Sequence, residues 1–326
     1  MEMNDAALQF NLAVSHTAHI DAARRAAVNL ARDAGAGQPL LDRLTLVIQE
    51  MARNLVLHAH GGEMLYFQNE RCLQLLAVDR GPGMQDVARC LSDSFSTAGT
   101  MGAGLGAIKR LADTFDLYSQ PGQGTVVFAG FDLQAPSAPL TVAGLSTPYP
   151  GEESCGDSWA CKGHRLMVCD GLGHGHAASL ASSRAREIFL QHDLNLPQET
   201  LLERMHHALA STRGGAVALA EVLPQQCEVR FCAMGNILGV LDDGRSRSMV
   251  SGNGTVGYRI GRIKSFSYPW SPSTVLLMAS DGIGSRFDLG AYPGLATRHP
   301  AVIAGVLHRD FRRHNDDATL VVLKHV

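Results

Sequence analysis

The sequence predicts an α/β protein of two domains, and three observations support this fold class. The chain has 326 residues, enough for two domains of ordinary size. A short, uncharged, Pro-rich segment at 134–139 has the composition of a linker. The pattern of apolar residues also changes there: before this segment it predicts helices interspersed with single strands, and after it a series of short apolar strands. We therefore expect domains at 1–133 and 140–326.

The first domain is predicted to begin with two helices. Pro39 suits the first turn of the second helix, which we expect to stop at Gly61-Gly62. The elements expected in this domain are helix 18–34, the helix from Pro39, strand 73–79, helix 106–115 and strand 125–131.

The second domain is predicted to be rich in β-structure, because several of its apolar segments are short and continuous. The expected strands are 140–145, 166–170, 216–222, 229–234, 274–279 and 319–323. The expected helices are 176–192, 199–211 and 299–314.

The charge balance argues against a nucleic-acid-binding surface. The net charge is −3, and division after Leu133 gives about −4 and +1 for the two parts. The seven cysteines form no C-x-x-C pair, which favours reduced and mostly buried thiols. The start lacks a signal-peptide profile, and no apolar run approaches the roughly 18 residues of a membrane helix. We expect a cytoplasmic protein that binds neither nucleic acid nor membrane.

The helix from Pro39 carries a polar stripe beside its apolar face. Glu50, Asn54 and His58 follow one another at intervals of four residues, so they lie on the same side of the helix. This spacing alone is common on solvated helix faces. The residues that follow it in the chain make a binding role the stronger interpretation.

Those following residues suit a nucleotide. Asp79 ends a predicted strand, and a carboxylate there can accept a hydrogen bond from an exocyclic amine such as that of adenine. Two glycines follow it and allow a close approach of the backbone to a flat ring, and three more precede a helix whose N-terminal amides suit phosphate: Gly81, Gly83, Gly102, Gly104 and Gly106. A Rossmann site fits poorly, because the polar stretch 92–100, which has the composition of a lid, precedes this last glycine run where a strand would be needed.

In this order and spacing, the segments Ile48–Ala59, Asp79–Gly83, Gly102–Gly106 and Gly124-Thr125 resemble the GHKL ATPase superfamily. The stretch is most similar to the serine kinases and anti-sigma factors of bacterial partner switches, above all to the RsbT type of stressosome switch kinase. The resemblance implies a GHKL α/β sandwich over 1–133. A sensor histidine kinase is disfavoured, because no helix for dimerisation precedes the ATP-binding segment.

The resemblance also implies roles for individual residues. Asn54 would hold Mg²⁺ against the phosphates of ATP, and Asp79 would recognise adenine, with Thr125 beside it. Gly81 and Gly83 would shape the base pocket, while Gly102, Gly104 and Gly106 would form the phosphate lid. Glu50 would act as the general base toward a serine hydroxyl. Lys109 and Arg110 fit a solvated helix face better than a phosphate contact.

In the second domain, four aspartates lie far apart in sequence, each in a Gly turn or at the end of an apolar stretch. They are Asp157, Asp170, Asp281 and Asp316. A single Asp-Gly is an ordinary turn, but four carboxylates that converged would repel one another by about 1–4 kcal/mol per pair at ~4 Å. Such a cluster requires cations, and oxygen ligands favour Mg²⁺ or Mn²⁺. Two such ions can activate a hydroxide for attack on phosphorus.

The strings Gly151–Asp157, Asp170–Gly175, Met234–Asn236, Ala279–Gly282 and Asp316–Val322 resemble the metal-dependent protein phosphatases (PPM). The similarity is to their SpoIIE-like subgroup, which includes the RsbX type, and it implies a β-sandwich flanked by helices. By resemblance, Asp157 and Asp281 ligate one metal, Asp170 bridges both and acts as a catalytic residue, the Gly171 carbonyl assists, and Asp316 completes the set of ligands for two Mn²⁺ or Mg²⁺ ions.

Several neighbouring residues have two interpretations. Asp317 stands where many PPM relatives carry Asn, which makes a ligand role doubtful. His174 could protonate the leaving serine oxygen or simply bond nearby backbone, and His176 suits a structural role. Glu152 and Glu153 suit two roles: they either support the metal ligands or are simply solvated. This half lacks an evident arginine near its first motif to hold substrate phosphate.

The leading hypothesis is a bifunctional regulator. Its first domain would phosphorylate a serine or threonine of a STAS-type anti-anti-sigma or stressosome protein, and its second would remove such a phosphate. Together the two activities would control a stress-signalling pathway, with a sigma factor or another downstream regulator as a further partner. The alternative is an ATP-binding, anti-sigma-like module that regulates the attached phosphatase without transferring phosphate. A degenerate phosphatase is disfavoured by its four retained carboxylates, and a homodimer is compatible with the sequence.

Overall fold

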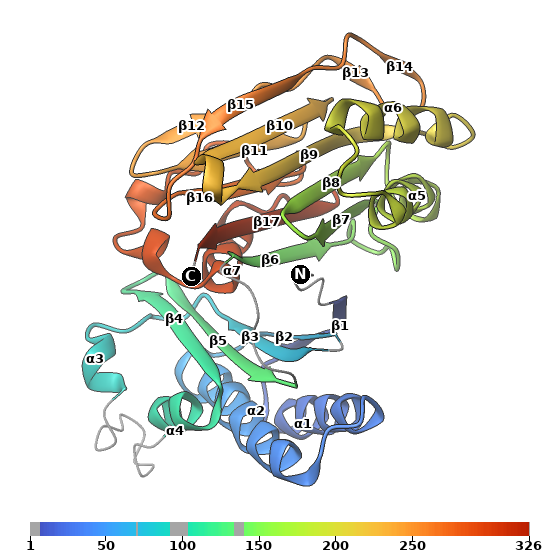
Figure 1. Ribbon diagram of the computed structural model, residues 1–326. Coiled ribbons are helices and arrows are strands. Elements are labelled where there is room, and N and C mark those ends of the chain that lie inside the picture. Colours follow the sequence, from blue (N-terminus) through green and yellow to red (C-terminus); the bar gives the residue numbers. More distant parts are fainter. Residues whose placement is uncertain (1–6, 70, 92–103, 134–139, 326) are drawn as a thin grey trace. The chain divides into compact units, whose positions relative to one another are not determined.

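The computed structural model describes residues 7–69, 71–91, 104–133 and 140–325 (Figure 1). Within these ranges the chain forms two compact units. One comprises 7–133 together with 297–306, and the other comprises 140–296 and 307–325. The segment 297–306 is thus grouped with the first unit, whereas the predicted boundary assigns it to the second domain. The predicted linker 134–139 lies outside the described residues, so the boundary itself stays a prediction.

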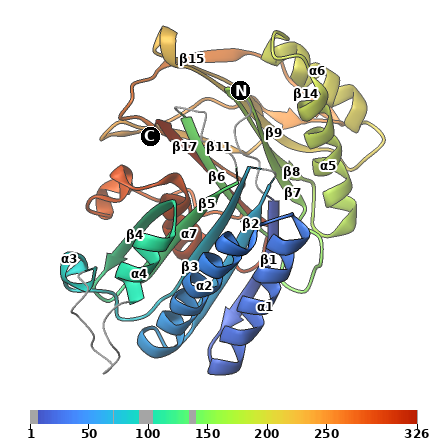
Figure 2. The same ribbon diagram turned by 60° about the horizontal axis from the view of Figure 1, so that its bottom comes forward.

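The first unit is built on an antiparallel five-stranded sheet in the order β1-β2-β3-β5-β4. Its helices α1, α2 and α4 lie on one face of this sheet (Figures 1 and 2). The elements are β1 Ala7–Val14, α1 Thr17–Asp33, α2 Gln38–His58, β2 Gly62–Gln68, β3 Cys72–Val78, α3 Val87–Cys90, α4 Gly104–Leu111, β4 Thr114–Gln120 and β5 Gly124–Asp132.

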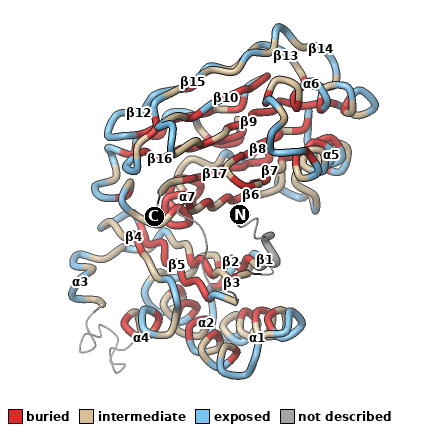
Figure 3. The backbone as a smooth tube through the Cα atoms, in the orientation of Figure 1, coloured by how far each residue is buried: buried red, intermediate tan, exposed pale blue. Residues whose placement is uncertain are grey.

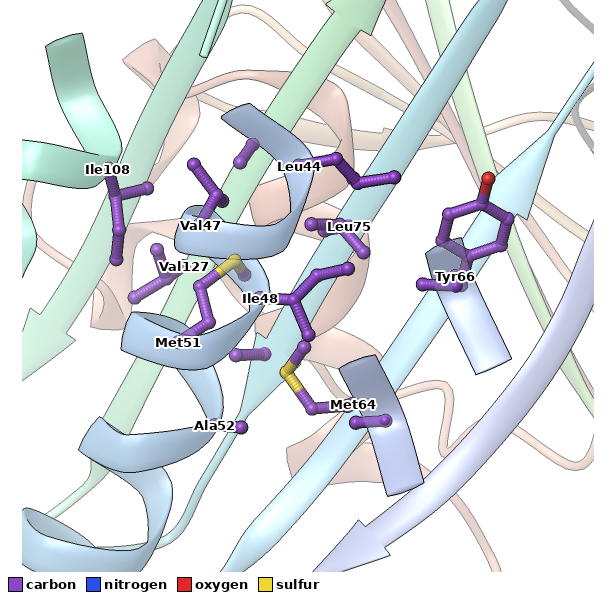
Figure 4. Packing of buried hydrophobic residues seen from close by; sticks show 14 of the residues in the cluster. Leu44, Val47, Ile48, Met51, Ala52, Met64, Tyr66, Leu75, Ile108 and Val127 are labelled. Carbon is purple, nitrogen blue, oxygen red and sulfur yellow. The ribbon is translucent and has the colours of Figure 1, made fainter. Parts of the chain in front are cut away.

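The core of this unit lies between α2 and the sheet. Leu44, Ile48, Met51 and Leu55, which share one side of α2, are all at most 3 % exposed, as the spacing predicts. Figure 3 shows buried and more exposed stretches along the helices of this unit. Figure 4 shows residues of α2 packed against Met64, Tyr66, Leu75 and Val127 of the sheet, with Ile108 of α4 closing the side. This packing fixes the rotation of α2 about its axis, so that the polar stripe lies directly beside the buried face.

The second unit contains two antiparallel five-stranded sheets, with orders β15-β10-β9-β8-β7 and β12-β11-β16-β17-β6. Its strands are β6 Leu140–Thr147, β7 Asp157–Lys162, β8 Arg165–Gly171, β9 Gly215–Leu223, β10 Glu228–Met234, β11 Leu238–Asp242, β12 Ser246–Ser248, β13 Gly254–Thr255, β14 Arg259–Ile260, β15 Ser265–Pro269, β16 Val275–Ala279 and β17 Ala318–His325. Its helices are α5 His176–Gln191 and α6 Gln198–Leu209, while α7 Pro300–Phe311 spans residues of both units.

The two sheets form a sandwich, because the inward side chains of each belong to one shared core. Alternate residues of β8 show the arrangement: Leu166 and Val168 face the other sheet, whereas Met167 and Cys169 pack beneath α5 and α6. A strand buried on both faces reads as a continuous apolar run, which is why 166–170 was predictable. The structure thus has the predicted α/β class, with an α/β sandwich followed by a β-sandwich flanked by helices.

The predicted helix 106–115 is wrong at its C-terminal end. Helix α4 stops at Leu111, and β4 begins at Thr114. Between them, Asp113 accepts hydrogen bonds from Arg43 Nη1 at 2.7 Å and from the Asp132 N–H at 2.9 Å. These partners lie far away in the sequence, so no local pattern signals where the helix ends.

Candidate functional site

A cavity of about 460 Å³ opens in the first unit, within the size range of small-molecule sites. Six residues predicted to bind ATP or to catalyse transfer line it: Glu50, Asn54, Asp79, Gly83, Gly104 and Thr125. Gly81 and the buried Gly106, each about two positions in the chain from one of these residues, do not line the cavity. Gly102 and the stretch 92–100 lie outside the described residues. Lys109 and Arg110 are exposed and do not line the cavity.

Asp79 is fixed in orientation at the end of β3. Its Oδ1 accepts hydrogen bonds from the N–H of Gly81 at 2.8 Å and from the N–H of Thr125 at 3.0 Å. The neighbouring β5 strand therefore holds the carboxylate in place beside the cavity. A preorganised acceptor of this kind suits the amino group of a purine.

Two glycines allow the backbone to close around the cavity. Gly83 has φ +68°, and a Cβ atom there would lie 2.1 Å from the Gln120 carbonyl oxygen. Gly104, the first residue of α4, lies across from α2: a Cβ there would be 3.1 Å from Glu50 Oε2 and 3.6 Å from Asn54 Oδ1. The backbone at the start of α4 thus lies directly against the acid–amide pair of α2.

Glu50 is engaged by a neighbouring cation. Arg53 Nη1 donates to Glu50 Oε1 at 2.7 Å, and both side chains line the cavity. The pair is partly solvated, with 25 % of the Glu50 side chain exposed. The sequence pattern did not predict this ion pair, although an Arg three positions after a Glu on a helix is a recognisable signal.

The cavity also has a lining that the glycine and acid motifs did not indicate. Apolar atoms come from Ala77, Met84, Leu105 and Val127. They suit the faces of a flat base, and this part of the lining could have been predicted only from the three-dimensional packing.

In the second unit, strand pairing brings the distant aspartates together. Asp157 at the start of β7 pairs with Asp170 near the end of β8. Asp281 follows β16 and Asp316 precedes β17, and these two strands are neighbours in the other sheet. The four carboxylates therefore gather where the ends of the two sheets meet.

Asp157 joins the two sheets. Only 5 % of the residue is exposed, and its Oδ2 accepts a hydrogen bond of 2.6 Å from Ser280 Oγ. The Ser280 hydroxyl oxygen in turn accepts from the Thr319 N–H at 2.9 Å. Asp157 Oδ1 is buried and has no hydrogen-bond partner among the described residues. An orphaned buried carboxylate oxygen is costly unless a cation satisfies it.

Burial and repulsion between the carboxylates raise pKa values within the cluster. Burial raises the pKa of Asp170, and the carboxylates of Asp157, Asp281 and Asp316 raise it further. Burial also raises the pKa of Asp157 and of Asp316. Asp157, Asp170 and Asp316 thus resist ionisation, an effect that a bound divalent ion would reverse.

The cluster is assembled in pairs. Asp170 lies within hydrogen-bonding distance of Asp281, and Asn236 Nδ2 donates to Asp281 Oδ2 at 2.7 Å. Among the residues that the structure describes, no group of three or more His, Cys, Asp or Glu side chains is arranged so that it could hold a metal ion. The donor chemistry nevertheless fits Mg²⁺ or Mn²⁺, because the donors are carboxylate oxygens and one of them is buried without a partner.

Asp317, which the sequence left doubtful as a ligand, lies within this cluster. It is 3 % exposed, and its Oδ1 accepts a hydrogen bond from the Tyr149 N–H at 2.8 Å. Its Oδ2 is buried without a partner among the described residues. A Cβ on Gly156 would lie 2.5 Å from that oxygen, so the turn before Asp157 is closed against Asp317.

His174 pairs with a carboxylate rather than with backbone. Its Nδ1 lies 2.9 Å from Glu152 Oε1, and its ring stacks on Tyr149 at 4.2 Å between centroids. Gly171 lies between Asp170 and this loop, and its N–H donates to the Gly156 carbonyl at 3.1 Å. Glu152 therefore supports His174, and the sequence alone could not distinguish this role from simple solvation.

Two known protein families match the two halves of the chain. The sequence pattern of the histidine kinase-like ATPase domain matches residues 13–130, which include the cavity. The pattern of stage II sporulation protein E (SpoIIE) matches residues 162–326, just over half of the chain. The chain belongs to the SpoIIE family. Its first unit is also 40 % identical over 114 residues to the serine/threonine-protein kinase RsbT of Bacillus subtilis (strain 168), a match that covers 34 % of this chain and 86 % of RsbT.

Solved structures share the fold of the second unit. One, from work on the bacterial stressosome as a modular system adapted to control secondary messenger signalling, superimposes with a TM-score of 0.52 at 23 % identity, covering 57 % of this chain and 99 % of that one. RsbX in complex with magnesium gives 0.50 at 18 % identity, covering 59 % and 98 %. The protein is thus a PPM-type serine/threonine phosphatase with an RsbT-like kinase domain, a combination that points to partner-switch regulation.

No helix among the described residues is both long and apolar enough to cross a membrane.

Proposed function

We propose that this chain both adds and removes a phosphate on serine or threonine residues of a STAS-domain anti-anti-sigma or stressosome protein. The observation that carries the proposal is that one chain holds both a cavity lined by Glu50 and Asn54 and a cluster of four aspartates. A sigma factor or another downstream regulator would respond to the phosphorylation state. The proposed place of action is the cytoplasm, and a homodimer is compatible with it.

In the kinase half, ATP would occupy the cavity, with adenine beside Asp79 and the phosphates at the start of α4. Asn54 would hold Mg²⁺ against the phosphates, and the amides of α4 would receive phosphate oxygens. Glu50 would take the proton from the serine hydroxyl as the terminal phosphoryl group is transferred.

In the phosphatase half, Asp157, Asp170, Asp281 and Asp316, with the Gly171 carbonyl, would hold two Mn²⁺ or Mg²⁺ ions. When bound, such ions supply an activated water and neutralise the charge of the phosphate. Ser280 keeps Asp157 in place, and Asn236 keeps Asp281 in place. His174, whose imidazole is paired with Glu152, would give a proton to the departing serine oxygen.

A second candidate function is an ATP-binding module that gates the phosphatase without transferring phosphate. The observation that favours it is the ion pair between Glu50 and Arg53, which occupies the proposed base. Retention of Glu50 in the cavity favours transfer, because nucleotide binding alone does not require a base.

Terminally labelled ATP separates these two functions. The chain is incubated with the labelled nucleotide, Mg²⁺ and a STAS-domain protein encoded beside it, and the protein-bound label is counted. The proposal predicts label on a serine or threonine of the STAS protein. Bound nucleotide without label on any protein would support the gating module instead.

A further inference from the structure

A short segment after α6 lies alongside the loop that carries the aspartate cluster. Gly215 pairs with Gly171 across the β8–β9 ladder, and the Leu172 N–H donates to the Gly214 carbonyl at 2.9 Å. A Cβ on Gly215 would lie 2.2 Å from the carbonyl oxygen of Asp170. The backbone at 213–215 is therefore held against the Asp170–Leu172 segment with no room between them.

This segment carries Arg213, whose backbone is anchored while its side chain is not. Thr212 Oγ1 donates to the Leu209 carbonyl at 2.8 Å and accepts from the Gly214 N–H at 3.0 Å. Arg213 itself is exposed, and among the described residues its guanidinium has no hydrogen-bond or ion-pair partner. A Cβ on Gly173 would lie 3.0 Å from its Nη1, which places the cation against the loop that follows Asp170.

Another cation near the cluster is already engaged. The charge of Arg313 acts on Asp316 and lowers the pKa of that carboxyl, against the stronger effect of burial. Arg313 is thus committed to a predicted metal ligand. Arg213 has no carboxylate partner among the described residues, so it can meet an anion that arrives from solution.

We propose that Arg213 binds the phosphoryl group of the substrate at the phosphatase site. This inference rests on the proposed phosphatase function, and it supplies the phosphate-binding arginine that the first motif of this half lacks. A guanidinium offers two parallel N–H donors that match two phosphate oxygens, whereas a lysine offers a single point of charge. The exposed position lets the same residue receive phosphate from a protein substrate or as the free ion.

The test compares three variants of the full-length, Mn²⁺-loaded protein: Arg213→Ala, Arg213→Lys and, as a matched control, Arg204→Ala. Arg204 is an exposed arginine of α6 and also lacks a partner among the described residues. Two quantities are measured for each: the Kd for inorganic phosphate by titration calorimetry, and KM and kcat for para-nitrophenyl phosphate and for a phosphorylated STAS protein. The thermal unfolding midpoint checks that each variant is folded.

Arg213→Ala should weaken phosphate binding by about 10- to 100-fold and raise both KM values by a similar factor, since hydrogen bonds to charged groups have this strength. Arg213→Lys should fall between it and the parent, and Arg204→Ala should match the parent. An effect confined to the protein substrate would overturn the proposal, because Arg213 would then contact the partner rather than the phosphate. Unchanged Kd and KM values would overturn it as well.

Failure of the underlying function would be distinguishable. If the parent hydrolysed none of the phosphoesters, the proposed phosphatase activity would be lost. The calorimetric Kd for inorganic phosphate would still decide on Arg213, because it requires no turnover.

Discussion

Glu50 and Arg53 are the residues on which the kinase half depends. Their ion pair fixes the Glu50 carboxylate inside the cavity, next to Asn54 and the start of α4. A fixed carboxylate can serve as a base, provided that a substrate hydroxyl reaches it. The pair is partly exposed, so it is weak enough to rearrange when substrate arrives.

Replacing Glu50 with Gln should slow phosphorylation of the partner by about 10²- to 10⁴-fold, since a positioned base contributes this much. ATP affinity should stay near that of the parent, because the side chain keeps its shape. Label transfer and equilibrium nucleotide binding are the two measurements. Asp42→Asn, a change of the same kind at an exposed position of α2 outside the cavity, is the control. Transfer by Glu50→Gln at the parental rate would contradict the role of Glu50 as the base.

His308 should make the second unit sensitive to acid. Burial, followed by the charge of Arg312, lowers the pKa of His308 from 6.5 to about 3. The folded protein keeps this ring neutral, while the unfolded chain accepts a proton below about pH 6.5. The contribution of His308 to stability is therefore present above pH 6.5 and is lost as the pH falls toward 3.

At pH 5 the loss should be about 2 kcal/mol relative to pH 7. Urea unfolding at both pH values, followed by tryptophan fluorescence, measures it, because both tryptophans, Trp159 and Trp270, belong to the second unit. His308→Gln should reduce the difference between the two pH values by this amount, and His314→Gln, at an exposed position, should leave it unchanged. An undiminished pH effect in His308→Gln would contradict the argument.

The turn that follows β16 sets the spacing of the aspartates. A Cβ on Gly282 would lie 1.8 Å from the Asp317 carbonyl oxygen, whereas one on Gly284 would meet only ordinary contacts at 3.5 Å or more. Gly282 therefore allows Asp281 and the Asp316-Asp317 segment to lie side by side. Two glycines of one turn thus differ sharply in what they permit.

Gly282→Ala should force these segments apart, destabilising the second unit by about 1–3 kcal/mol, as overpacking does. Metal-dependent phosphatase activity should fall with it, and ATP binding should not change. Gly284→Ala is the matched control and should behave like the parent. The readouts are tryptophan-monitored unfolding, phosphoester hydrolysis and nucleotide affinity. Equal behaviour of the two variants would show that the turn does not position the aspartates.

Elements whose apolar residues recur with one strong period, or form a continuous run, could be predicted from the sequence. Helix α2 and strands β8 and β9 are of this kind, because their burial follows directly from residue spacing. Strands β4 and β7 were missed, since they are only partly buried and carry polar residues such as Asp116 and Ser158 within them. Half-exposed strands depend on their neighbours for stability, and the local sequence does not identify those neighbours.

The candidate sites show the same division. Residues whose own side chains would bind the nucleotide or the metal, such as Asp79 and Asp170, could be proposed from the order of the motifs alone. Residues that act by position could not: Ser280 holds Asp157, Arg53 holds Glu50, and Arg213 reaches the Asp170 loop from a distant segment. Their roles depend on contacts made only after the chain has folded.

For the whole molecule, the central claim is that two opposing activities reside in one chain. A kinase and a phosphatase that ran together on one substrate would consume ATP without effect, so their rates should respond differently to nucleotide. The two sites use separate residues, and Glu50 and Asp170 can therefore be changed independently. Each change should remove one activity and leave the other.

The most direct test follows the phosphate on the partner STAS-domain protein over time, first with labelled ATP and then after the ATP has been enzymatically removed. For the parent, the label should rise and then decay. For Asp170→Asn it should rise and persist, and for Glu50→Gln it should fail to rise. Label that persists with the parent as it does with Asp170→Asn, or that accumulates normally with Glu50→Gln, would contradict the account.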